Sequence, residues 1–348
     1  MSQLTTHSIL HSWLSCFVNW IKPDPDKKDD NSEKADNVTK NVRQNAEADG
    51  LQVTDTPEGG SDAKASGLRR HYRGHSEVDG YDIDRPFVIK EEDKNGNKVT
   101  DPLSKFETYV RTSYPDSEIT PTNSSVNLKF SNELRFDIVP MFATDKKDEQ
   151  IIIKRDGTRI RTSVQKHNEF VKKRTRLSKE SAGRVKFNEC LRGLKWWKEF
   201  QADNSYYFQY DETTGKDNRP PSALIDWLAA YAFDQLGVEK TYAETFAKWF
   251  GFLADIIRNK KPVYFTDYYS APSLTGKTGW IVLDPVNADN NITGKWDSNK
   301  LNEFATWFEK ARDSWSRIIR HDIDGDETMA MEELVKLFGN PFKNHCKE

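Results

Sequence analysis

The chain has 348 residues, of which 36% are hydrophobic and 12% aromatic, enough for one large packed unit or two smaller ones. Its 52 basic and 55 acidic residues give a net charge of -3. A protein that binds long nucleic acid over its surface is usually basic, so this balance disfavours long nucleic acid and leaves local patches for nucleotides.

The cysteines and the apolar segments bear on the cellular compartment. Cys16, Cys190 and Cys346 are far apart, and their spacing forms neither a disulfide framework nor a metal-binding motif. A reducing cytoplasm is therefore the expected location. The apolar run over 8–18 lacks a basic leading region and is too short to span a bilayer. We expect it to be a helix that docks on the body of the protein, with no membrane partner.

The N-terminal part of the chain predicts helices and loops. Apolar residues at helical spacing over 9–20 predict a helix. The charged stretch over 23–35 contains prolines and predicts a linker, and the polar stretch over 32–48 predicts a second helix. Residues 54–67, which are rich in glycine, predict a mobile loop.

The middle of the chain alternates between strand and helix patterns. The predicted order is a strand over 83–89, a helix over 102–113, and strands over 126–130, 134–142 and 151–153. Such alternation predicts a mixed sheet with helices packed on it.

The remainder of the chain is mostly helical. Apolar periodicity predicts a helix around 185–194, another over 220–237, and a long helix over 301–319. A further helix begins at Thr241, where Glu244 completes a capping box. The switch from sheet to helices near residue 160 is the predicted domain boundary.

Three aspartates are the candidate chemical groups. Asp82 and Asp84 lead into the strand over 83–89, and side chains at i and i+2 of a strand share one face, where they repel unless a cation lies between them. Asp137 stands among apolar residues of the strand over 134–142, and burying it is costly unless it is paired or binds a metal. If the two strands are neighbours, the three carboxylates form a cluster that suits Mg²⁺ or Mn²⁺. A DxD pair alone is weak evidence, because it also occurs by chance.

These elements resemble those of a known family. Asp82 and Asp84, followed by Phe-Asp-Ile-Val-Pro at 136–140, resemble the DxD and hDhVP motifs of polymerase-β-like nucleotidyltransferases. The resemblance is greatest to the cGAS/DncV-like (CD-NTase) branch of bacterial antiphage (CBASS) signalling. Three later segments also match in the expected order: residues 191–197 resemble a vRxLKxW helix, 221–226 a pSyxxE helix start with Asp for Glu, and 283–292 a DPxxPxNN element.

The resemblance implies an α+β fold. It consists of a polymerase-β-like mixed sheet with helices and a C-terminal helical domain, with the active site in the cleft between them. The implied domains are N-terminal helices and a linker over 1–50, a catalytic core over 51–162, and a helical nucleotide-binding domain over 163–348. Asp82, Asp84 and Asp137 would hold two Mg²⁺ ions, with Mn²⁺ as a substitute.

The resemblance also implies phosphate contacts before the DxD pair. The family usually has Gly-Ser there, but Leu68 stands where the serine is expected. Ser66, the backbone near Gly67, Arg69 and Arg70 are candidate nucleotide contacts, because peptide N–H groups and guanidinium groups bind phosphate. The alternative is a solvated basic loop.

Four residues of the C-terminal half are further nucleotide-binding candidates. Lys195 would reach the triphosphate, the alternative being a solvated helix face. Ser222 would donate to phosphate at a helix N-terminus, or act only as an N-cap. Asp284 and Asn291 would contact the base or the acceptor.

The implied function is the joining of NTPs (ATP, GTP or others) into a cyclic di- or oligonucleotide second messenger, with release of pyrophosphate. An effector protein would respond to the product. One alternative is a transferase that modifies RNA ends or proteins. Another, suggested by Leu68, is a catalytically inactive nucleotide-binding subunit.

Overall fold

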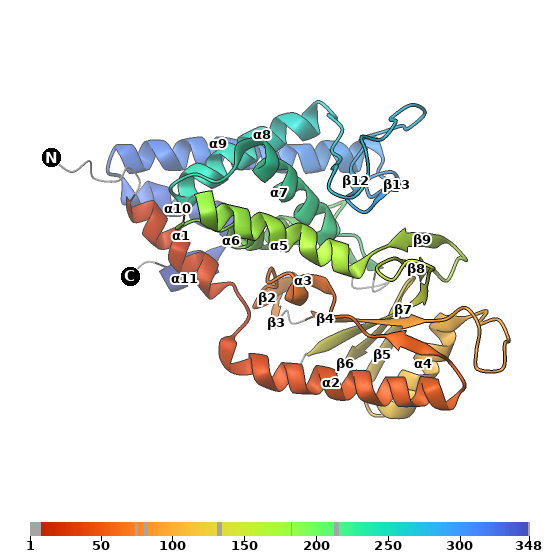
Figure 1. Ribbon diagram of the computed structural model, residues 1–348. Helices are drawn as coiled ribbons and strands as arrows, with labels where there is room; N and C mark the ends of the chain where they lie inside the picture. Colours follow the sequence, from red (N-terminus) through yellow and green to blue (C-terminus); the bar gives the residue numbers. More distant parts are fainter. Residues whose placement is uncertain are drawn as a thin grey trace. The chain divides into compact units, whose positions relative to one another are not determined.

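The computed structural model describes residues 8–73, 76–79, 82–130, 134–181, 183–211 and 216–346 (Figure 1). The chain divides into two compact units. One comprises Met1–Lys22, Arg70–Val78 and Val171–Glu348, and the other comprises Pro23–Arg69 and Asp79–Phe170.

The second unit is built on a mixed seven-stranded sheet. Five strands form the order β1-β4-β7-β6-β5, and β8 and β9 extend from β7. Of the paired strands, β4 and β7 are parallel and the other pairs are antiparallel. The strands are β1 (Val53–Asp55), β4 (Asp82–Ile89), β5 (Glu118–Pro121), β6 (Val126–Lys129), β7 (Arg135–Ala143), β8 (Gln150–Ile153) and β9 (Arg159–Thr162). This confirms the predicted mixed sheet.

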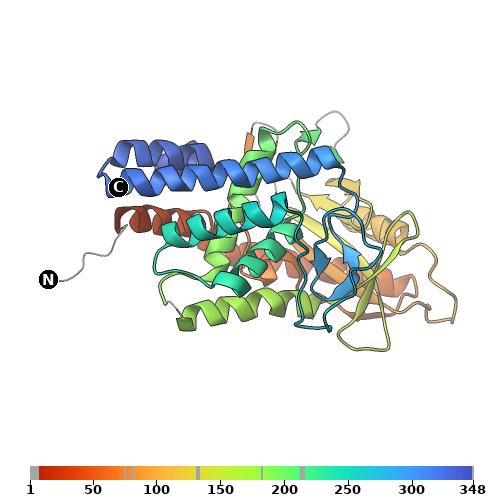
Figure 2. The same ribbon diagram turned by 90° about the horizontal axis from the view of Figure 1, so that it is seen from above.

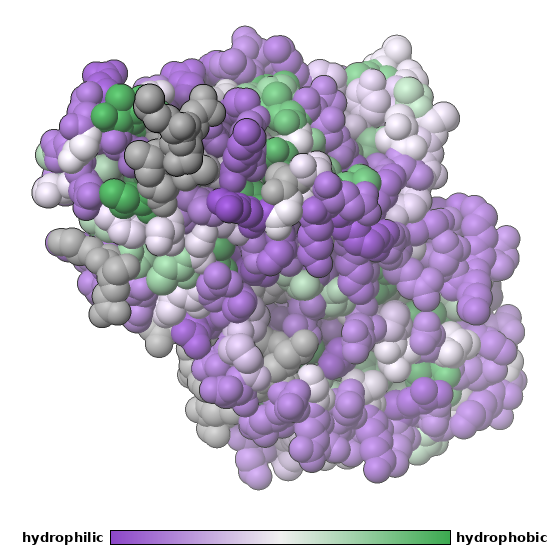
Figure 3. All heavy atoms as spheres, turned by 60° about the vertical axis from the view of Figure 1, so that its left-hand side comes forward, coloured by the Kyte–Doolittle hydropathy of each residue, from purple (hydrophilic) through white to green (hydrophobic). Residues whose placement is uncertain are grey.

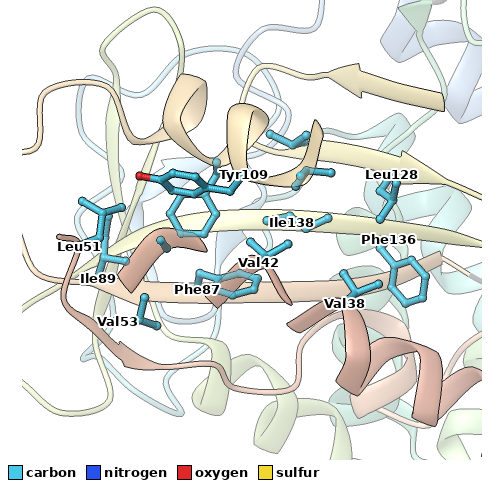
Figure 4. Close-up of a cluster of buried hydrophobic side chains, with 14 of the residues drawn as sticks. Val38, Val42, Leu51, Val53, Phe87, Ile89, Tyr109, Leu128, Phe136 and Ile138 are labelled. Atoms are coloured by element: carbon cyan, nitrogen blue, oxygen red, sulfur yellow. The ribbon is translucent and has the colours of Figure 1, made fainter. Parts of the chain in front are cut away.

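Two helices cover one face of this sheet. α2 (Pro25–Ala48) and α4 (Pro102–Ser113) contribute buried apolar residues to the same core as the strands. Val38 and Val42 of α2 and Tyr109 of α4 lie around Phe87 and Ile138 of the sheet (Figure 4). Because strand side chains alternate, the residues between the core positions point to the opposite face.

Two predictions for the N-terminal segment are wrong. Residues 23–35 are not a linker, because α2 begins at Pro25, and the side chain of Asp24 accepts a hydrogen bond from Asp26 N at 3.1 Å. This cap and the proline in the first turn offset the high charge of the segment. Residues 54–67 are not simply a loop, since they contain the end of β1 and the short helix α3 (Gly60–Ala63).

The other unit is mainly helical. Its helices are α1 (Ser8–Trp20), most of α5 (Val164–Ser181), α6 (Phe187–Asp203), α7 (Ser222–Leu236), α8 (Tyr242–Arg258), α9 (Ser298–Ile323), α10 (Glu327–Phe338) and α11 (Asn340–Cys346). α9 and α10 lie side by side (Figure 2). Four fully buried tryptophans fill this unit, and such large rings contribute much of a core's burial. They are Trp196, Trp197, Trp249 and Trp315.

Short hairpins complete the described fold. They pair β2 (Arg70–Arg73) with β3 (Ser76–Asp79), β10 (Tyr210–Asp211) with β11 (Lys216–Asp217), and β12 (Leu283–Asp284) with β13 (Asn287–Asn291). The division between the units falls within α5, after Phe170, whereas the sequence placed a boundary near 160. Because α5 runs continuously across the division between the two units, the sequence shows no change of composition at that point.

Thr241 is the N-cap of α8, as predicted, since its side chain accepts from Glu244 N at 3.2 Å. The Glu244 carboxylate accepts from the Thr241 hydroxyl at 2.9 Å, so only the N-cap half of the predicted capping box is confirmed. In the part of the chain that the structure describes, none of the helices combines the length and the hydrophobicity that spanning a membrane requires.

The surface drawn in Figure 3 is mostly hydrophilic, with apolar residues in small separate areas. This agrees with the 31% of charged residues in the chain.

Candidate active site

The three predicted aspartates lie on adjacent strands. β4 and β7 pair in parallel, with Asp84 opposite Asp137 and Asp82 opposite Arg135. Register partners in a sheet point to the same face, so the three carboxylates share one face. The predicted neighbourhood of the two strands is therefore confirmed.

This face is the one that α2 and α4 leave uncovered. Ile83 and Phe136 belong to the core beneath those helices and are almost fully buried. Asp84 and Asp137 are half-buried, and Asp82 is exposed. The alternation of the strands thus separates an apolar face that stabilises the sheet from a polar face that is available for chemistry.

Asp137 is oriented by the neighbouring strand β6. Its Oδ1 accepts a hydrogen bond from Asn127 Nδ2 at 3.1 Å and one from Ser125 Oγ at 3.4 Å. Asn127 is also the register partner of Asp137. Asn127 was not among the residues predicted from the sequence, although the alternation of Val126 and Leu128 with polar residues places it on the polar face.

Asp84 is in tight contact with α3. A Cβ on Gly60 would lie 1.7 Å from Asp84 Oδ2, and Gly60 has φ +73°. A Cβ on Gly59 would lie 3.0 Å from Pro86 Cγ. Only glycine allows both this approach and this backbone conformation at position 60. Gly59 and Gly60 predict only a loop from the sequence, because their position against the carboxylate depends on the tertiary structure.

Positive charge accompanies Asp82 on the same face. Arg135, its register partner, is 5% exposed, and Lys129 is opposite Arg135 on β6. Lys129 Nζ lies 3.4 Å from Glu118 Oε2, which extends the charged row across the sheet. Arg135 and Lys129 thus place two basic residues on the face that carries the carboxylates. Arg135 is a second residue that the sequence analysis missed.

The carboxylates are neighbours without forming an assembled metal centre. Among the described residues, no three His, Cys, Asp or Glu side chains converge closely enough to hold an ion. The oxygen donors of Asp82, Asp84 and Asp137 are nevertheless of the type that Mg²⁺ and Mn²⁺ prefer. Their role as metal ligands stays a prediction.

Ser66 and Gly67 make structural contacts. Ser66 is fully buried, and its backbone N–H and its hydroxyl both donate to Ser61 O, at 2.9 and 3.4 Å. A Cβ on Gly67 would lie 3.3 Å from Pro23 Cγ. These contacts hold the segment that follows α3, and a role in phosphate binding stays a prediction.

Of the two arginines that follow Leu68, the structure describes the side chain of Arg69 only. A guanidinium nitrogen of Arg69 lies 3.1 Å from Asp24 Oδ2, in a half-buried ion pair. The Arg70 side chain lies outside the described part of the chain. The alternative of a fully solvated basic loop therefore does not describe Arg69.

Lys195 lies in the interior. It is 3% exposed, and its Nζ is 2.7 Å from Asp226 Oδ1, which belongs to an equally buried side chain of α7. The alternative of a solvated helix face is therefore wrong. Asp226 occupies the place where the family pattern has Glu, and its contact with Lys195 gives that position a structural reason.

Ser222 is the first residue of α7. The N-cap residue is Pro221, so the alternative of Ser222 as N-cap is wrong. Ser222 is exposed, and its hydroxyl lies 3.5 Å from Nζ of the buried Lys198, which also contacts Glu199. A hydroxyl at a helix N-terminus beside an ammonium group suits an anion, but phosphate binding here stays a prediction.

Asp284 and Asn291 shape the β12–β13 hairpin. Asp284 is buried and accepts from Val286 N at 2.9 Å and from Asn290 Nδ2 at 3.1 Å. Asn291 accepts from Val282 N at 2.9 Å and donates to Trp280 O at 3.2 Å. The observed contacts are structural, and contact of either side chain with a nucleotide stays a prediction.

A mixed sheet that carries a DxD pair, with a third aspartate in register on the parallel neighbouring strand, is the arrangement that the resemblance to polymerase-β-like nucleotidyltransferases predicts. The family model of the second messenger oligonucleotide or dinucleotide synthetase domain matches residues 9–175. The part of the chain that carries Asp82, Asp84 and Asp137 is therefore similar to this synthetase domain, as the resemblance to the CD-NTase family predicts.

Known proteins are similar to the chain in sequence and in fold. The chain is 22% identical over 242 residues to a cyclic AMP-AMP-AMP synthase of Escherichia coli strain MS 115-1, covering 67% of this chain and 69% of that protein. Its fold is similar to that of E. coli MS115-1 CdnC with ATP, with a TM-score of 0.72, 21% identity, and 95% and 98% of the two chains covered. It is also similar to Bradyrhizobium diazoefficiens CdnG in complex with GTP, with a TM-score of 0.69, 17% identity and 96% of each chain covered. These likenesses confirm the predicted fold class.

Proposed function

We propose that the protein joins nucleoside triphosphates into a cyclic di- or oligonucleotide second messenger, releasing pyrophosphate, as part of antiphage signalling. The observation that carries this proposal is the register of Asp84 with Asp137 on the face of the sheet opposite α2 and α4, with Asp82 beside them. The relatives support it, since one is named for a cyclic AMP-AMP-AMP product and others were solved with ATP or GTP.

The oxygen donors of the carboxylates are of the kind that a divalent cation prefers. Asp82, Asp84 and Asp137 present oxygen donors from one face of two paired strands, and we propose that they hold Mg²⁺, with Mn²⁺ as a substitute. Bound ions of this kind activate an attacking hydroxyl and neutralise the charge that develops on the leaving pyrophosphate. Asn127 and Ser125 keep the Asp137 carboxylate in one orientation, and Gly60 allows α3 to approach Asp84.

The parts of the chain have proposed tasks. Residues 51–162, which contain the carboxylate sheet, would form the catalytic core, and residues 163–348 would bind nucleotide. Lys195 and Ser222 would contact the triphosphate, and Asp284 and Asn291 would fix the hairpin that contacts a base or the acceptor. Ser66, Gly67, Arg69 and Arg70 would lie near the donor phosphates.

The proposal has a direct test. The purified protein is incubated with the four labelled NTPs and Mg²⁺ or Mn²⁺, then treated with phosphatase and separated by chromatography. We expect a phosphatase-resistant cyclic product in the wild type and none in Asp82→Asn or Asp137→Asn. Asp145→Asn, at an exposed position of the same unit, is the matched control and should retain activity.

The same assay separates the alternatives. A transferase acting on RNA ends or proteins would consume NTPs only when such an acceptor is added. An inactive subunit would bind NTP without releasing pyrophosphate, and equal turnover by the wild type and Asp137→Asn would contradict the proposed site. We further propose a cytoplasmic location, supported by the three free cysteines, and an effector protein that senses the product.

A further inference from the structure

Two cysteines at opposite ends of the sequence meet in the helical unit. Cys16 is an exposed residue of α1, and Cys346 is a buried residue at the end of α11. Cys16 Sγ lies 3.0 Å from the backbone oxygen of His345, the residue before Cys346. The side chain of Cys16 therefore reaches the end of α11, directly beside Cys346.

The surrounding helices hold this contact in place. The rings of Trp20 and His345 stack, with 4.1 Å between their centroids and an interplanar angle of 17°. Phe17 and Phe342 pack with their centroids 4.8 Å apart. These two ring pairs pack α1 against α11 next to Cys16 and Cys346.

We propose that Cys16 and Cys346 form an intramolecular disulfide when the protein meets a peroxide, which ties α11 covalently to α1. The pair is free in the structure, as a reducing compartment requires. This disulfide would be a modification of the helical unit, and its formation does not depend on the nucleotidyltransferase activity.

The chemistry begins at the exposed sulfur. The Cys16 thiolate attacks one oxygen of hydrogen peroxide, the O–O bond breaks, and the released hydroxide takes a proton to become water. The Cys16 sulfenic acid is then attacked by Cys346 sulfur, the S–O bond breaks, and the hydroxyl leaves with the thiol proton as a second water. The two sulfurs together lose two electrons, which reduce one peroxide.

The environments of the thiols favour this order. Burial, with the contact to Cys16, raises the pKa of the Cys346 thiol, which makes Cys346 a poor first nucleophile. The position of Cys346 beside Cys16 suits the second step, in which its sulfur attacks the sulfenic acid of the same molecule. Cys190 is fully buried in α6, where burial raises the pKa of its thiol well above the ordinary value, so it should stay reduced.

The test uses the full chain treated with increasing hydrogen peroxide, followed by mass spectrometry without reductant. We expect the loss of two hydrogens, a linked peptide pair containing Cys16 and Cys346, unmodified Cys190, and reversal by dithiothreitol. The bridge closes a long loop, so the oxidised wild type should melt about 5 °C or more above the reduced form. Cys16→Ser, at an exposed position, should show neither the linked peptide pair nor the rise in melting temperature.

Cys346→Ala is the second variant, and it should accumulate a Cys16 sulfenic acid that dimedone captures. The proposal is overturned if wild-type Cys16 is consumed while Cys346 remains a free thiol, whether Cys16 ends as a sulfinic acid or links two copies of the chain. Equal capture of sulfenic acid by dimedone in wild type and Cys346→Ala would overturn it as well.

Discussion

Replacing Gly60 with alanine places a methyl group against the Asp84 carboxylate. The new carbon would lie 1.7 Å from Oδ2, 2.6 Å from Cγ and 2.9 Å from Cβ of Asp84. Rotation of the carboxylate does not relieve the contact with Cβ, so α3 or β4 has to shift as well. To restore a separation of 3.0 Å, the oxygen alone has to move by about 1.3 Å.

The size of the effect follows from two separate terms. The left-handed backbone at position 60 costs about 1–2 kcal/mol for any residue with a Cβ. Gly157 has φ +82° with nothing within 4 Å of the added carbon, so Gly157→Ala isolates this backbone term in the same unit. A misplacement of about 1 Å in a reacting group costs about 100-fold in rate. We therefore expect Gly60→Ala to lose about 100-fold or more in turnover, and Gly157→Ala to retain the wild-type rate.

The assay is the initial rate of pyrophosphate release at saturating NTP, with urea unfolding of each variant in parallel. Gly60→Ala should be less stable than Gly157→Ala and much slower. Wild-type turnover in Gly60→Ala, with a loss of stability no larger than in Gly157→Ala, would refute the tight contact of α3 with a catalytic Asp84.

The polar contacts of Asp137, Lys195 and Glu333 each lead to a measurable expectation. Asn127→Ala removes the donor that orients Asp137 and should lower turnover or Mg²⁺ affinity by about 10-fold, seen as a shifted Mg²⁺ titration. Asp226→Ala takes the counter-charge from the buried Lys195 and should lower the free energy of unfolding by about 3–5 kcal/mol in urea. Glu333 has a pKa of about 2, because hydrogen bonds from its basic neighbours outweigh the rise caused by burial. Its contribution to stability is present above pH 4.5 and lost as the pH falls toward 2.

Each of these predictions has a control. A Mg²⁺ titration unchanged in Asn127→Ala would show that Asp137 needs no support from β6. Glu239→Ala, which breaks the exposed ion pair with Lys248, should cost at most about 1 kcal/mol, and an equal loss in Asp226→Ala would contradict the importance of the buried pair. The melting temperatures of Glu333→Gln and wild type should converge between pH 4.5 and 2, and a constant gap would exclude the assigned linkage.

Much of the local structure could be predicted from side-chain spacing. The helix over 102–113 and the strand over 83–89 were predicted within one residue, because helical and strand periodicities need only neighbours in the chain. The start of α2 was missed because its exposed face is highly charged, and only the buried stripe, such as Val38 and Val42, records its packing.

The sequence by itself determined that Asp82 and Asp84 share a face, because alternation along a strand is a local property. Only the tertiary structure decided that Asp137 lies opposite Asp84, that Gly60 contacts that carboxylate, and that Cys16 meets Cys346. Such contacts depend on which strands pair and which helices pack, and these choices are made by burial of the whole core rather than by the residues between the partners.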